Sequence, residues 1–105
     1  MEIIETPIFT RRVLSLLTDD EYHLLQVSLL IRPDQGEIIE GSGGLRKLRW
    51  PLCGRGKSRG ARVIYYLSFR KETILMLFIY SKAEQDDLSP DQLKLLSRLV
   101  KEEFS

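Results

Sequence analysis

The chain has 105 residues, of which 43% are hydrophobic and 30% are charged, a balance typical of one globular domain over residues 1–105 with a single modest core. Because no apolar run approaches the roughly 18 residues that cross a bilayer, a transmembrane helix is excluded. The N-terminus lacks the pattern of a secretory signal, and the single cysteine excludes an internal disulfide, so we expect a cytoplasmic protein.

The first third of the chain predicts a strand followed by two helices. Residues 2–5 form the strand, and Thr6 is then an N-cap with Pro7 at the first helical position. Helical spacing predicts a buried face made of Phe9, Val13, Leu16 and Leu17. The segment Thr18–Glu21 matches a capping box and begins a second helix, which Pro33 ends. We expect the two helices to pack as a hairpin.

The rest of the chain predicts three strands and a final helix. Residues 45–50, 61–69 and 73–81 are strand-like, and the third run is apolar almost throughout, so we expect both of its faces to be covered. A helix capped by Ser89 follows, with an apolar face of Leu93, Leu96, Val100 and Phe104. This order predicts an α+β fold, in which the N-terminal strand and the two-helix hairpin pack on a curved antiparallel sheet with a C-terminal helix.

Charge is strongly segregated along the chain, although the net charge is only +1. From Gly41 to Lys71 there are nine basic residues and no acidic one, whereas the remaining residues hold seven basic and all fifteen acidic ones. Segregation of this kind is typical of a surface that binds a polyanion. The alternative interpretation is a basic hairpin that is merely solvated.

Strand alternation predicts where the cations converge. Lys47 and Arg49 share one face of their strand, because the bulky apolar residues beside them should point to the core. Arg62 begins the next strand, while Tyr80 and Lys82 share a face at the end of the last one. If the three strands are neighbours, these five candidate catalytic residues meet on one patch. An exposed sheet face that bears only cations would repel itself unless an anion bound there.

Such a patch suits the cleavage of RNA by its own 2′-hydroxyl. Arginine and lysine held close to a phosphate neutralise the extra charge of the phosphorane, and a lysine crowded by other cations could act in proton transfer. Tyr80 could stack on a base or donate a hydrogen bond. A phosphate-binding surface without chemistry would look the same, and Lys82 with Glu84 could be a surface ion pair. RNA-binding contacts are predicted for Arg46 and for the glycine-spaced loop cations Arg55, Lys57 and Arg59.

Other motifs predict neither a cofactor nor a metal. The segment Gly54–Ser58 resembles the end of a P-loop, but Pro51 occupies the position of the first required glycine. His23 has no predicted partner, and Cys53 has no histidine nearby in the sequence. One histidine and one cysteine do not make a conventional structural zinc site.

Three stretches of the chain, residues 44–49, 60–66 and 79–84, resemble toxins of the RelE/HigB superfamily. The likeness is greatest to the HigB branch, which has a glycine-rich basic loop between its second and third strands, and the order of elements matches over nearly the whole chain. The resemblance implies a RelE-like toxin domain and a ribosome-dependent endoribonuclease, which cuts mRNA without metal and leaves a cyclic phosphate. It also implies that Lys47, Arg49 and Arg62 contact the mRNA.

The resemblance further implies the partners of such a toxin: the ribosome with its mRNA, and a cognate helix-turn-helix antitoxin that silences the enzyme. Operator DNA would be bound only through the toxin–antitoxin complex, and no membrane is involved. The chain departs from the RelE pattern at Ala83, where RelE has an arginine, and at Leu88, where RelE has a tyrosine slightly later. Tyr80 and Lys82 could substitute, so the residue that transfers the proton stays open.

Two rival functions share much of this pattern. A ParE-type toxin has the same fold but inhibits DNA gyrase through protein contacts, and such chains generally lack cations on the central strands. A plain RNA-binding module would use the same cations without chemistry. Because this chain carries the central cations, we favour the nuclease over the gyrase inhibitor, whereas the sequence separates the nuclease from the binding module poorly.

Overall fold

The computed structural model describes residues 1–52 and 60–104, which form a five-stranded sheet and three helices. The elements are, in chain order, β1 (Glu2–Glu5), α1 (Pro7–Leu16), α2 (Asp19–Ile31), β2 (Glu37–Ile38), β3 (Leu45–Trp50), β4 (Ala61–Ser68), β5 (Thr73–Ser81) and α3 (Pro90–Phe104). The strands lie in the order β1-β5-β4-β3-β2. The predicted α+β fold is confirmed.

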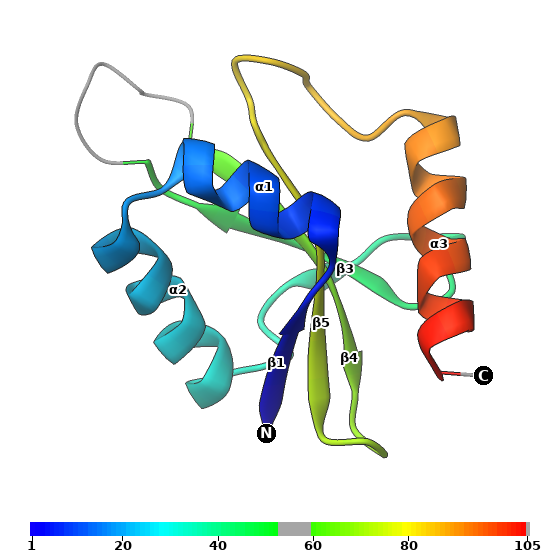
Figure 1. The fold of residues 1–105 in the computed structure, drawn as a ribbon. Helices are drawn as coiled ribbons and strands as arrows, with labels where there is room; N and C mark the ends of the chain where they lie inside the picture. Colours follow the sequence, from blue (N-terminus) through cyan, green and yellow to red (C-terminus); the bar gives the residue numbers. More distant parts are fainter. Residues whose placement is uncertain (53–59, 105) are drawn as a thin grey trace.

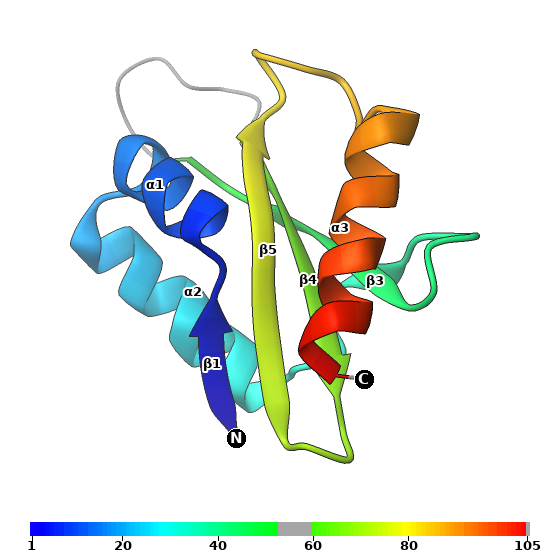
Figure 2. The same cartoon turned by 45° about the vertical axis from the view of Figure 1, so that its right-hand side comes forward.

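The sheet lies between two layers of helices (Figure 1). The pair α1 and α2 covers one face and α3 covers the other, and the turned view of Figure 2 separates α3 from the pair. Each layer encloses its own cluster of buried side chains. The apolar strand β5 serves both clusters, because Ile74 and Met76 belong to the first while Leu75 and Leu77 belong to the second. Both faces of this strand are therefore covered, as the sequence predicts.

All three helices begin at the caps that the sequence predicts. The Thr6 hydroxyl accepts a hydrogen bond from a backbone N–H of the first turn of α1 at 3.1 Å. Thr18 and Glu21 form the reciprocal capping box of α2. Ser89 does the same with Gln92, at 3.1 Å and 2.9 Å. These signals could be read from the sequence because each cap depends on residues only three positions apart.

The two edges of the sheet differ from the prediction. Strand β1 does not pack on the sheet but extends it, parallel to β5, with Glu2 opposite Thr73. At the other edge the short strand β2, which the sequence pattern does not predict, pairs antiparallel with β3. The three central strands are antiparallel to one another, as predicted.

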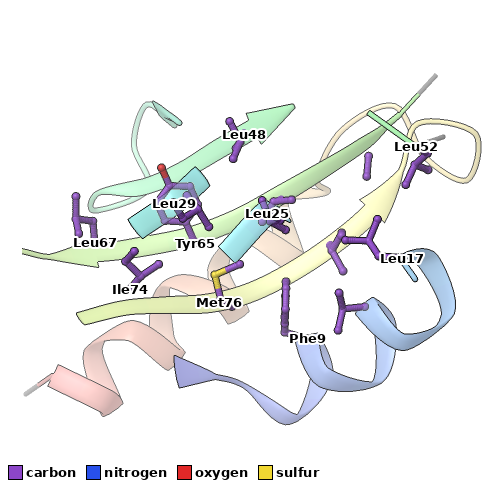
Figure 3. Close-up of a cluster of buried hydrophobic side chains, with 14 residues drawn as sticks. Phe9, Leu17, Leu25, Leu29, Leu48, Leu52, Tyr65, Leu67, Ile74 and Met76 are labelled. Carbon is purple, nitrogen blue, oxygen red and sulfur yellow. The ribbon is translucent and has the colours of Figure 1, made fainter. Parts of the chain in front are cut away.

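Figure 3 shows the cluster beneath α1 and α2, and one of its members, Tyr65, also fixes the chain between α2 and β2. Tyr65 of β4 is fully buried in this cluster. Its hydroxyl donates to the carbonyl of Pro33 at 2.8 Å and accepts from the N–H of Gly36 at 2.9 Å. The adjacent Tyr66 points the other way and packs against Phe104 of α3, with ring centroids 5.4 Å apart. Tyr65 thus holds the segment 33–36 against the sheet, next to the site described below.

Candidate nucleic-acid interface

The register of the central strands places three of the predicted site residues in a row. Arg49 of β3 lies opposite Arg62 of β4, which in turn lies opposite Tyr80 of β5. Side chains directly opposite on antiparallel strands have Cβ atoms about 5 Å apart, so the three lie side by side on the face that α3 partly covers. Their proximity is a property of the structure, while their part in catalysis stays a prediction.

A cleft of about 370 Å³ is hollowed over this part of the sheet. Lys47, two residues before Arg49 and on the same face of β3, lines it together with the two arginines. The loop between β5 and α3 and the strand β2 form other parts of the wall. The charged lining consists of four cations, Lys47, Arg49, Arg62 and Lys82, and three carboxylates, Glu37, Asp86 and Asp87.

Asp87 is a residue of the cleft that the sequence reasoning missed. Its Oδ1 accepts hydrogen bonds from the Leu88 N–H at 2.8 Å, from the Lys47 ammonium at 3.3 Å and from the Tyr80 hydroxyl at 3.5 Å. The Leu88 N–H, and then Lys47, hold the pKa of Asp87 below its ordinary value of 3.8, although partial burial opposes them. The prediction of a face that bears only cations is therefore wrong. The signal that could have found the carboxylate is the acidic pair soon after β5.

Neutralising Lys47 is expected to raise the pKa of Asp87 only part of the way back toward 3.8. Lys47→Gln removes the ion pair, but the Leu88 N–H, which is the larger cause, remains. The depressed pKa stabilises the folded protein only while Asp87 is ionised, so this stabilisation is present above pH 3.8 and is lost as the pH falls through the lower pKa of the folded state. Following the carboxyl ¹³C shift against pH measures the pKa.

Lys82→Gln is the matched control for this titration, because the Lys82 ammonium contacts a carbonyl oxygen instead of Asp87. It should move the pKa of Asp87 less than Lys47→Gln does. Identical titration curves for the wild type and Lys47→Gln would contradict the pairing of Lys47 with Asp87.

Tyr80 is fully buried, and its ring lies 5.9 Å from that of Phe78. Burial, and after it the Asp87 carboxylate, raises the pKa of Tyr80 to about 12, although Arg62 acts in the opposite direction. The phenol is therefore protonated at neutral pH and can donate a hydrogen bond. Because the ring is covered, this geometry favours hydrogen-bond donation over base stacking, the other role considered from the sequence.

Of the predicted site residues that the structure describes, Tyr80 and Arg46 do not line this cleft. Lys82 lines it and donates to the carbonyl of Asp86 at 2.5 Å, while Glu84 forms an ion pair with an arginine of α1. Arg46 lies on the opposite face of β3 and donates to two carbonyls of the segment 34–36, at 3.1 Å and 2.8 Å. It supports the cleft wall instead of lining the cleft. The three loop cations lie outside the described residues: Arg55, Lys57 and Arg59.

Two features are absent from residues 1–52 and 60–104. No three histidine, cysteine, aspartate or glutamate side chains gather there in a way that could hold a metal ion. Within the same ranges, none of the helices has the length and apolar character needed to cross a membrane.

The comparisons with known proteins show the fold. No family model matches the sequence. Among solved structures, the chain is similar to the E. coli toxin RelE, a variant with two arginines replaced by alanine, in its free state. The TM-score is 0.59 and the identity 12%, over 93% of this chain and 94% of that chain. The chain has a RelE-like fold. At this identity the likeness shows the architecture alone.

Proposed function

We propose that this protein is the toxin of a type II toxin–antitoxin system, of the HigB branch, and that it cuts mRNA on the ribosome without metal or another cofactor. The observation that carries the proposal is the row of Arg49, Arg62 and Tyr80 across three adjoining strands, whose two arginines line one cleft together with Lys47. The similarity in fold to the toxin RelE supports it. Lys82, which also lines the cleft, would add charge at its edge.

The two arginines of the row are arranged to receive a phosphate. Within residues 1–52 and 60–104, neither Arg49 nor Arg62 forms an ion pair with a carboxylate. Like charges directly opposite on neighbouring strands destabilise a sheet by a few tenths to about 1 kcal/mol. A phosphodiester bound between them would relieve this repulsion. It would also gain charge-assisted hydrogen bonds, which strengthen as negative charge builds up on the phosphorane.

The protonation states in the cleft restrict which groups can move protons. Tyr80, protonated at neutral pH but fully buried and outside the lining of the cleft, would act through Asp87, because its hydroxyl donates to that carboxylate at 3.5 Å and would hold it in place. Asp87, ionised at neutral pH, can act only as an acceptor, which suits the proton of the attacking 2′-hydroxyl. Lys47, which lines the cleft beside Asp87, would give the proton to the leaving 5′-oxygen, because a bound phosphate would compete with Asp87 for its ammonium.

The proposed partners follow from the same function. The ribosome would present the mRNA, and a cognate helix-turn-helix antitoxin would silence the toxin in the cytoplasm. The toxin would reach operator DNA only within the complex with its antitoxin.

Induced expression of the wild-type chain tests the proposal. We expect growth arrest together with new mRNA 5′ ends that are spaced in phase with codons and appear only in translated regions. The ends can be mapped by primer extension and high-throughput sequencing. Growth arrest with intact mRNA and broken chromosomes would instead indicate a gyrase inhibitor, and intact mRNA without arrest would indicate a binding module.

A further inference from the structure

A second basic groove lies along the outer side of α3, apart from the cleft. Its volume is about 440 Å³, and its lining consists of Lys94, Ser97, Arg98 and Lys101 with Leu93 and Gly41. None of these residues lines the cleft over the central strands. The described part of the molecule thus has a second hollow lined by several cations, separate from the cleft.

The groove has two walls that are held together. One wall is α3, and the other is the loop between β2 and β3, which Figure 2 shows beside that helix. The Ser97 hydroxyl donates to the carbonyl of Ser42 in the loop at 2.9 Å, and Ser42 is 3% exposed. The loop reaches the helix through Gly41 at φ 73° and Gly43 at φ 76°, a conformation that favours glycine. The groove is therefore a fixed feature of the fold.

Among the residues that the structure describes, no carboxylate forms an ion pair with the cations of this groove. Lys94, Arg98 and Lys101 follow one another at i, i+4 and i+7, so they lie on one side of the helix. No ion pair of the described residues involves any of them. Glu102 stands four residues after Arg98, at the spacing of a helical ion pair, yet the two are not paired in the structure. The three positive charges therefore face solvent along roughly 10 Å of helix, at 1.5 Å per residue.

We propose that this groove binds the sugar–phosphate backbone of structured RNA, as a second contact outside the cleft. A protein partner would need apolar anchors in the centre of its contact, and Leu93 is the sole large apolar residue of this lining. A row of unpaired cations instead matches a backbone with regularly spaced phosphates. The choice of RNA rests on the proposed function, because the substrate of the cleft would bring folded RNA next to the groove.

Binding of an RNA hairpin to the full chain tests the groove. The probe is a fluorescein-labelled hairpin with 2′-O-methyl sugars, which cannot be cleaved because it has no 2′-hydroxyl. In the triple variant Lys94→Gln, Arg98→Gln, Lys101→Gln, we expect the affinity to fall by about tenfold or more at low salt. The slope of log K against log salt concentration should flatten by about 2 to 3, close to one for each lost phosphate contact. Fluorescence anisotropy over a series of KCl concentrations measures both.

A matched variant removes three exposed cations elsewhere: Arg11→Gln, Arg70→Gln, Lys71→Gln. It lowers the net charge by the same amount as the groove variant, so it measures how much RNA affinity is lost through the overall charge alone. Equal affinities and slopes for the two triple variants would overturn the proposal that the groove binds RNA. So would a groove variant that binds the hairpin like the control but no longer binds an acidic protein partner.

The same assays separate the groove from the proposed nuclease. If the groove variant alone loses hairpin binding while wild-type expression leaves mRNA intact, RNA binding by the groove is supported and the proposed nuclease activity is rejected. If the wild type cuts mRNA but the groove variant binds the hairpin like the control, the proposed nuclease activity is supported and RNA binding by the groove is rejected.

Discussion

Replacing Arg62 with alanine is expected to lower mRNA cleavage by about 10²- to 10³-fold, the usual loss when one preorganised donor to a transition-state oxyanion is removed. Arg62 is the centre of the row, flanked by Arg49 on one side and Tyr80 on the other. Its removal therefore takes away the charge at the middle of the proposed phosphate site. The yield of new mRNA 5′ ends at a fixed time after induction measures the effect, and growth arrest should disappear with them.

The loss should come from chemistry and not from unfolding. Arg62 is only partly buried, and its described side-chain hydrogen bond goes to the neighbouring Ala61 carbonyl. Removing it also relieves the repulsion by Arg49, so the unfolding midpoint and antitoxin binding should be retained. Arg70→Ala, which removes an exposed arginine from the turn between β4 and β5, is the matched control and should stay fully toxic. Full cleavage by Arg62→Ala would remove the arginine row from the mechanism.

The parts of the fold that were predicted correctly are those that local patterns determine. The capping box at Thr18 and the alternation along residues 45–50 each depend on neighbours within a few positions. The pairing of β1 with β5 joins segments about seventy residues apart, and no local pattern encodes it. Strand β2 is equally dependent on tertiary context, because its two residues pair only once β3 is in place.

The candidate site was predicted in the same uneven way. Alternation placed Lys47 and Arg49 on one face, and the same rule puts Arg46 on the other, so its position behind the cleft wall could also have been predicted. The full burial of Tyr80 depends on its packing with Leu96 of α3 and Leu88 of the loop after β5, which a strand pattern does not specify. Asp87 reaches Lys47 forty residues away in sequence through that same loop. Strand patterns thus predicted the cations, while loop geometry supplied their counter-charge.

Replacing Phe9 with alanine is expected to lower the free energy of unfolding by about 3–5 kcal/mol, a large share of the 5–15 kcal/mol typical of a domain. Phe9 is fully buried in the cluster that joins α1 and α2 to the sheet (Figure 3). Its ring lies 5.9 Å from that of Tyr22. The backbone N–H of Phe9 also donates to the N-cap Thr6. The helix cap and the buried cluster therefore hold the same residue in place. The shift in urea midpoint measures the loss.

Leu14→Ala is the matched control for this substitution, because Leu14 lies on the same helix with 72% of its surface exposed and should change stability by only a few tenths of a kcal/mol. Phe9→Ala should lose toxicity through its unfolded fraction, so the loss should be greater at higher growth temperature. Arg62→Ala should instead be inactive at every temperature at which it is folded. This contrast distinguishes a residue that stabilises the fold from one that acts in cleavage. If Phe9→Ala unfolded at the same urea concentration as Leu14→Ala, the cluster under α1 would not be what holds the helical layer on the sheet.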